Sequence, residues 1–184
     1  RNSTLTTQMP KASTSQILGN TESIEAITSN IYMRKVLSGE FPVVNKYLVQ
    51  DLMANKLWTP EIVNEIIKNN GSIQTITEIP ENIKEVYKTV WEIKQKYVIL
   101  QSTSRGPYLD MTQSLNLFIA KPNLSILSSM AFFAWKQGLK TGQYYLRSKP
   151  AAQSIQFTVT NSKKVTELIT IEENENESCE MCSS

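Results

Sequence analysis

The sequence predicts an α/β fold, in which helices alternate with a few short strands. Apolar residues recur at three- and four-residue spacing in residues 60–67 and 83–98, which is typical of helices with one buried face. Residues 115–120 form a short, largely apolar run, typical of a strand buried on both faces. With 184 residues, 40% of them hydrophobic, the chain is long enough for one core. Because the predicted strands are few for an α/β domain, we expect the chain to be part of something longer.

The first twenty residues predict a strand, a loop and a helix. Residues 3–7 favour β structure, and Ser13, Thr14 and Ser15 are good N-cap residues for a helix that begins near Gln16. Free amides at a helix start, together with three hydroxyls and Lys11, would also suit a phosphate group. Runs of Ser and Thr before helices mostly serve as caps, so the residues alone leave both interpretations open.

Two further helices are expected in the middle of the chain. Thr59 and Pro60 predict a helix start, and residues 69–71 predict the end of that helix. A second helix is expected to start near Pro80 and to continue along its apolar stripe to residues 105–107, where Gly-Pro breaks it. Both stripes are predicted to be core.

After the strand at 115–120, Asn123 predicts the cap of a helix over residues 124–138. Its predicted core face consists of Leu124, Leu127, Met130, Ala131, Ala134 and Trp135. Phe132 and Phe133 widen the apolar surface, which is either extra core or a docking groove for a partner segment. Two short strands are expected at 144–147 and 155–159, and the polar, acidic composition beyond residue 161 predicts disorder.

The charge is unevenly distributed along the chain. Five acidic residues and no Lys or Arg follow residue 171, which leaves 19 basic and 12 acidic residues in the preceding part. No cluster of Lys and Arg is interleaved with aromatic residues, so we expect no nucleic-acid binding. No apolar run is long enough to span a bilayer and no signal peptide is recognisable, so we expect no membrane association and a soluble, cytoplasmic protein.

Histidine is absent, which excludes Ser-His-Asp triads and histidine-based zinc hydrolysis. The only two cysteines, Cys179 and Cys182, have C-x-x-C spacing and cannot supply four zinc ligands. They are either a dithiol used for exchange or two idle thiols. Glu177 and Glu180 flank the pair and disfavour the thiolate.

Tyr144 and Tyr145 are adjacent aromatic residues at the expected start of a strand. Aromatic residues pack well in strands, which is the simplest interpretation. Two phenols in succession could instead relay a hydrogen-atom equivalent between two sites. Since successive side chains of a regular strand point to opposite faces, such a relay requires a distorted strand start. We therefore expect the two rings close together near a surface, with Gly142 allowing the backbone to turn.

Several blocks of this sequence occur in a characteristic order: residues 9–20, 28–32, 36–41, 70–74, 87–93, 113–116 and 135–147. Together they resemble the C-terminal part of the large, catalytic subunit of class I ribonucleotide reductase, of the eukaryotic type. The resemblance runs from the first residue to about residue 157 and resumes at the terminal C-x-x-C. It implies that residues 1–160 belong to the ten-stranded α/β barrel of that family, and that residues 161–184 form a flexible acidic tail.

The resemblance also implies roles for three groups of residues. The segment Pro10, Lys11, Ala12, Ser13 and Thr14 is similar to the family's substrate diphosphate loop, with Lys11 where the family has threonine. Tyr144 and Tyr145 match the radical-relay pair, with Tyr145 on the incoming side and Tyr144 facing the thiyl-forming cysteine. Cys179 and Cys182 match the tail dithiol that re-reduces the active site. No metal site is implied.

The activity implied by the resemblance is the reduction of ribonucleoside diphosphates to deoxyribonucleoside diphosphates, for DNA precursor synthesis. The implied partners are a small subunit that supplies a metal/tyrosyl radical, a second large subunit, and thioredoxin or glutaredoxin. No cofactor is expected in this chain, and the ATP/dNTP effector sites would precede residue 1. The thiyl-forming cysteine would also precede residue 1, so we expect this fragment alone to be inactive. The alternative is a non-catalytic module, whose helix at 124–138 docks the small subunit's C-terminal peptide. A thiol-exchange module is a weaker alternative.

Overall fold

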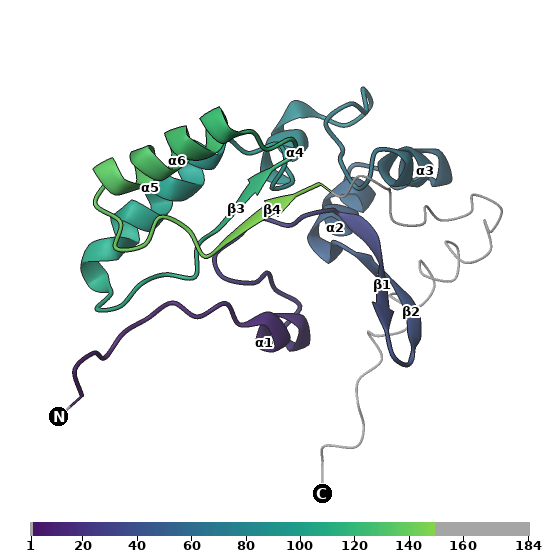
Figure 1. Cartoon of the computed structure of the whole chain (residues 1–184). Helices are drawn as coiled ribbons and strands as arrows, with labels where there is room; N and C mark the ends of the chain where they lie inside the picture. Colours follow the sequence, from purple (N-terminus) through teal and green to yellow (C-terminus); the bar gives the residue numbers. More distant parts are fainter. Residues whose placement is uncertain (1, 150–184) are drawn as a thin grey trace, which may run out of the picture.

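The computed structural model describes residues 2–149 (Figure 1). The elements are the helices α1 (Ala12–Ile17), α2 (Lys46–Ala54), α3 (Pro60–Lys68), α4 (Glu81–Val86), α5 (Gln95–Arg105) and α6 (Leu124–Lys136), the 3-10 turn η1 (Gly106–Tyr108), and the strands β1 (Ile31–Val36), β2 (Gly39–Val44), β3 (Asn116–Ile119) and β4 (Tyr145–Ser148). These strands form two separate two-stranded sheets, so residues 2–149 contain no closed barrel. The strand expected at 155–159 and the tail expected at 161–184 lie outside the described residues.

The first sheet is an antiparallel hairpin that the sequence analysis did not predict. Its register pairs Ile31 with Val44 and Val36 with Gly39 across a two-residue turn. Gly39, the first residue after the turn, has φ 144°, a conformation that glycine adopts readily and other residues rarely do. Ile31 is the buried anchor of β1, and the hairpin extends away from α2 and α3 (Figure 1). Arg34 on β1 donates a hydrogen bond to Gln16 on α1.

Helices α2, α3 and α4 enclose the first hydrophobic core with the base of this hairpin. Its most deeply buried side chains are Leu48, Leu52, Ile66, Ile73, Ile76 and Ile79. Helix α3 starts as predicted, because Thr59 Oγ1 accepts a hydrogen bond from Ile62 N and Pro60 occupies the first turn. Helix α2 was not predicted, although Asn45 caps it by accepting from Tyr47 N.

The single helix predicted from Pro80 to residue 105 is wrong. The structure divides it into α4 and α5, separated by residues 87–94. Side chains supply the hydrogen bonds in this break: Glu92 accepts from Thr89 N at 2.7 Å, and Gln95 donates to Val90 O and Ile93 O. The Tyr87 hydroxyl donates to Asp51 on α2 at 2.7 Å, which ties the end of α4 to the first core. Burial and this hydrogen bond raise the pKa of Tyr87 to about 12.

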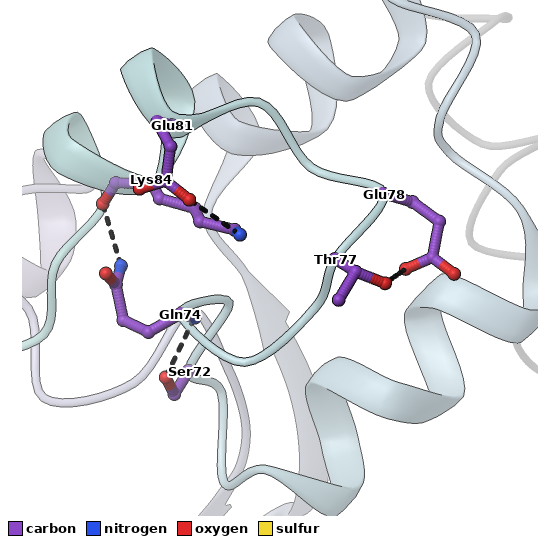
Figure 2. Close-up of polar contacts among 6 residues, drawn as sticks. All are labelled: Ser72, Gln74, Thr77, Glu78, Glu81 and Lys84. Atoms are coloured by element: carbon purple, nitrogen blue, oxygen red, sulfur yellow. Dashed lines mark hydrogen bonds and ion pairs between the residues drawn. The ribbon is translucent and has the colours of Figure 1, made fainter.

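Polar side chains organise the loop between α3 and α4 (Figure 2). Gln74 donates through Nε2 to Lys84 O at 2.7 Å, and its own N–H donates to Ser72 Oγ at 3.2 Å. Lys84 is buried and pairs with Glu81 at 3.0 Å. These contacts satisfy polar groups beside Ile73, Ile76 and Ile79, so a loop without regular structure can still contribute to the core.

The second core lies between β3, α5 and α6 (Figure 1). All four residues of β3 are buried, as the apolar run predicted, and β3 pairs in parallel with β4. Helix α6 begins at the predicted cap, because Asn123 Oδ1 accepts from Ile126 N at 2.8 Å. Its predicted core face is only partly correct: Ala134 is buried, Leu127 and Met130 are half-buried, but Leu124, Ala131 and Trp135 are exposed.

Residues 3–7 are not a strand, contrary to the prediction. The nearest β contact is an isolated parallel bridge between Gln8 and Gln113. The Asp110 carboxylate accepts hydrogen bonds from Leu5 N and Thr6 N, which lowers the pKa of Asp110. Since a side chain occupies the amides that a neighbouring strand would use, the segment is extended but lies beside no ladder. Within residues 2–149, no helix is long and apolar enough to cross a bilayer.

Candidate functional site

The tyrosine pair lies at the start of β4 beside the second core. Tyr145 is the first residue of the strand, and Tyr144 precedes it. The backbone is fixed at both positions, since Tyr144 N donates to Leu115 O at 2.6 Å and Tyr145 N donates to Asn116 Oδ1 at 3.2 Å. A strand start of this kind is free of the strict alternation of side chains that a continuous pleat imposes.

The two rings meet, as expected for a relay. Their centroids are 4.3 Å apart with an angle of 61° between the planes. About half of each side chain is exposed (51% for Tyr144 and 52% for Tyr145), so a partner could cover both. Hydrogen bonding and proximity to Tyr145 raise the pKa of Tyr144 above its ordinary value. The expectation of close rings near a surface is confirmed.

Gly142 lies in a bend of the backbone, as expected. It does not adopt a left-handed conformation, and a Cβ built on it would lie 3.5 Å from the Cβ of Ala134. That distance is an ordinary van der Waals contact, so neither the backbone conformation nor the space beside α6 requires glycine at this position.

The candidate phosphate loop surrounds the start of α1. The helix begins at Ala12, earlier than the predicted start near Gln16, and no side chain caps it. Lys11 occupies the N-cap position with φ 55°, in the left-handed region. Ser15 is not a cap, since it is buried and its hydroxyl donates to Ala12 O at 3.0 Å. Lys11, Ala12, Ser13 and Thr14 are exposed and Pro10 is half-buried.

The structure links this loop to the tyrosine strand through residues 20–25. Ser23 N donates to Pro10 O at 2.8 Å, and Glu22 forms an ion pair with Arg147 at 3.5 Å. The guanidinium of Arg147 lies 5.7 Å from the centroid of the Tyr145 ring. The sequence analysis did not identify Glu22 or Arg147, because partners 125 residues apart leave no spacing pattern in a sequence.

An apolar groove of about 610 Å³ lies between α6 and β4. Its lining includes Leu117, Met130, Trp135, Leu139 and Leu146. Phe132 packs edge to face against Trp135 on the exposed side of the helix. Phe133, in contrast, packs against the second core, so the two phenylalanines have different roles.

Cys179 and Cys182 lie outside the described residues, and the structure does not place them. Among residues 2–149, no group of three His, Cys, Asp or Glu side chains is arranged to hold a metal ion.

Comparison with known proteins identifies the class to which this fold and site belong. Residues 1–145 match the family model described as ribonucleotide reductase, barrel domain. The chain therefore belongs to the ribonucleotide reductase barrel-domain family, in agreement with the resemblance of its sequence blocks.

Individual relatives are consistent with the family. The chain is 54% identical, over its whole length and 24% of the relative, to the ribonucleoside-diphosphate reductase large subunit of Caenorhabditis elegans. It is 58% identical to the large subunit of Danio rerio, covering 95% of this chain and 22% of that protein. A solved class Id ribonucleotide reductase alpha subunit from Actinobacillus ureae superposes with a TM-score of 0.65 and 35% identity, covering 76% of this chain and 25% of that one. The chain thus spans about a quarter of the length of these relatives.

Proposed function

We propose that this chain is the radical-relay portion of a ribonucleoside-diphosphate reductase large subunit, which reduces ribonucleoside diphosphates to deoxyribonucleoside diphosphates for DNA synthesis. The observation that carries the proposal is the contact between the exposed rings of Tyr144 and Tyr145, with centroids 4.3 Å apart. The names of the relatives, ribonucleoside-diphosphate reductase large subunit, support the substrate class.

The tyrosine pair acts as a relay in this proposal. A tyrosyl radical on Tyr145 takes one electron and one proton from Tyr144, so that Tyr145 becomes a phenol and Tyr144 becomes the radical. Tyr144 then takes an electron and a proton from a cysteine thiol in the preceding part of the subunit, which leaves a thiyl radical there. Contact between the rings matters because a hydrogen-atom equivalent moves only between groups held in a close and fixed geometry.

The other predicted residues have supporting roles. The loop of Pro10, Lys11, Ala12, Ser13 and Thr14 binds the diphosphate, for which the exposed Lys11 adds positive charge. Cys179 and Cys182 reduce the active-site disulfide, giving up two electrons and two protons as they form their own disulfide, and thioredoxin or glutaredoxin reverses that step. The enzyme works in the cytoplasm with a radical-supplying small subunit and a second large subunit, under control of ATP and dNTP effectors bound elsewhere.

A chimeric large subunit, called the complemented subunit below, tests the relay. We would replace the matching segment of the Caenorhabditis elegans subunit by this chain, add the small subunit, and measure deoxyribonucleotide formation. Tyr144→Phe and Tyr145→Phe are each expected to reduce turnover to background while ribonucleoside diphosphate still binds. Tyr108→Phe is the matched control, because Tyr108 is an exposed tyrosine outside the pair and its loss leaves turnover unchanged. Activity retained by either relay variant contradicts the proposal.

The second candidate function is docking of the small subunit's C-terminal peptide without chemistry. The exposed Trp135 and Phe132 beside the groove at α6 favour it. In the complemented subunit, Trp135→Ala would weaken peptide binding at least tenfold, whereas Tyr145→Phe would not change it. An unaltered affinity of Trp135→Ala excludes the groove as the docking site.

A further inference from the structure

A buried amide connects Tyr145 to a carboxylate from a distant part of the chain. Asn116, in β3, is 1% exposed, and both ends of its side-chain amide have partners. Its Oδ1 accepts from Tyr145 N at 3.2 Å, and its Nδ2 donates to Glu25 Oε1. Resting on the function proposed above, we propose that Glu25 and Asn116 are positioning residues for the radical relay, which together fix Tyr145 at the start of β4.

The chemistry of the three groups fixes the direction of these bonds. The backbone N–H of Tyr145 can only donate, and an ionised carboxylate can only accept. An amide between them must therefore present its oxygen to Tyr145 and its nitrogen to Glu25. Glu25 thus selects the orientation of the Asn116 amide, and that orientation supplies the acceptor for Tyr145.

The relay depends on this bond because the neighbouring ladder is short. Asn116 and Tyr145 are opposite each other in the parallel register, and β4 begins at this pair. On its other side, the Tyr144 amide already donates to Leu115 O. The side chain of Asn116 therefore holds the backbone at the strand start, where the two tyrosines depart from the regular alternation of a strand. About half of each tyrosine is exposed, so few other contacts fix their positions.

The segment of residues 21–25, which contains Glu25, also acts on the ring of Tyr145. Glu22 pairs with Arg147, and the Arg147 guanidinium lies 5.7 Å from the ring centroid. Glu25 itself is held by Thr21, whose hydroxyl donates to Glu25 O at 2.7 Å. Residues 21–25 therefore hold both the backbone and the ring of Tyr145, and the bond from Ser23 N to Pro10 O connects them to the candidate phosphate loop.

The environment of Glu25 suits this role. The pKa of Glu25 is raised, because burial outweighs the opposite effects of the hydrogen bond from Asn116 and the charge of Arg147. The carboxylate is thus taken partly out of water, where a hydrogen bond to it is stronger than at an exposed surface.

Exchanging the donor and the acceptor tests the proposal in the complemented subunit. Asn116→Asp places two carboxylates against each other and removes the bond to Glu25. We expect kcat to fall about 100-fold, as for a small misplacement of a reacting group, with KM for the ribonucleoside diphosphate within about twofold. Adding Glu25→Gln restores a donor–acceptor pair with reversed roles, since the new amide donates to the new carboxylate and that carboxylate still accepts from Tyr145 N. The double variant should recover at least tenfold of the lost kcat.

Amide hydrogen exchange gives a readout that does not depend on catalysis. The Tyr145 amide should exchange faster in Asn116→Asp than in the parent and return toward the parent rate in the double variant. If Asn116→Asp does not fold, Glu25→Met serves instead, because it removes the acceptor at similar volume; we expect about a tenfold loss of kcat and faster exchange at Tyr145. Glu40→Gln, which removes the carboxylate of a surface ion pair on the hairpin, should change neither quantity.

The outcomes separate this inference from the function on which it rests. Suppose that the parent subunit is inactive but the Tyr145 amide exchanges faster in Asn116→Asp and returns toward the parent rate in the double variant. That result contradicts the proposed function and still supports the positioning contact. An active parent whose Asn116→Asp and Glu25→Met variants keep full kcat and an unchanged Tyr145 exchange rate overturns the inference. A double variant no better than Asn116→Asp also overturns it, since rescue is specific to the pair.

Discussion

At the scale of single residues, Tyr144 and Tyr145 show how a local irregularity makes a contact that regular structure forbids. Neighbours in a pleated strand point to opposite faces. Here the pair spans the boundary between loop and strand, where one amide binds a backbone carbonyl and the next binds a side-chain oxygen. Because the change of partner falls between the two residues, their rings can come within 4.3 Å.

Gly71 is the residue at which a single added carbon has the clearest consequence. A Cβ there would lie 1.9 Å from Ser29 Oγ and 2.7 Å from Asn30 N, and the residue has φ +80°. Asn30 is fully buried and donates to Gly71 O and Tyr87 O, so the backbone on that side has little room to move.

Gly71→Ala is therefore expected to lower the free energy of unfolding by about 3 kcal/mol or more, combining overpacking with strain at positive φ. Gly19→Ala is the matched control: Gly19 has φ +62° but no atom within 4 Å of the added Cβ. Its cost should be about 1 kcal/mol, from backbone strain alone. Urea denaturation of both variants measures the difference, and equal costs would show that the contact with Ser29 and Asn30 relaxes freely.

At the scale of elements, local signals determined some boundaries and not others. The caps at Thr59 and Asn123 were predicted, because a capping side chain acts on amides two or three residues away. The break between α4 and α5 was not predicted, because the helical spacing of apolar residues continues through residues 87–94. In the structure, Gln95 instead accepts a hydrogen bond from Phe118 N on β3. Tertiary hydrogen bonds overrode a helical pattern there.

Replacing Asn123, Thr59 or Ser13, each predicted as a cap residue, by Ala is expected to lower the free energy of unfolding by different amounts. Asn123→Ala should cost about 1 to 2 kcal/mol, because its bond to Ile126 N is 2.8 Å long, and Thr59→Ala about 0.5 to 1 kcal/mol, because its bond to Ile62 N is 3.4 Å long. Ser13→Ala should cost almost nothing, since α1 has no side-chain cap. Thermal or urea unfolding ranks the three, and a large loss for Ser13→Ala would indicate a cap that the structure does not show.

At the scale of the whole molecule, residues 2–149 contain two separate hydrophobic cores. The first joins the hairpin to α2, α3 and α4, and the second joins β3 to α5, α6 and β4. The tyrosine pair lies beside the second core, at the start of the strand whose Leu146 packs against that core, so its position depends on that core and only indirectly on the first.

Matched substitutions in the two cores should have different effects on the tyrosine strand. Leu52 and Leu117 are each at most 1% exposed, and Leu→Ala at either site should cost about 2 to 5 kcal/mol. Leu117→Ala is expected to speed amide exchange at Tyr144 and Tyr145, whereas Leu52→Ala speeds it mainly in α2 and α3. Equal exchange at the tyrosines in both variants would show that the two cores unfold as one unit.

The sequence by itself determined the α/β class, the buried strand at 115–120, the two helix caps and the family, because these follow from local spacing and from ordered blocks of residues. It also located the tyrosine pair. Only the tertiary structure decided which face of α6 is exposed and where the long apolar stripe breaks. It also decided that Asn116 and Arg147 lie against Tyr145 and are themselves bound by Glu25 and Glu22. Contacts such as Arg147 with Glu22, 125 residues apart, depend on how the chain is folded in space, so a linear pattern cannot reveal them.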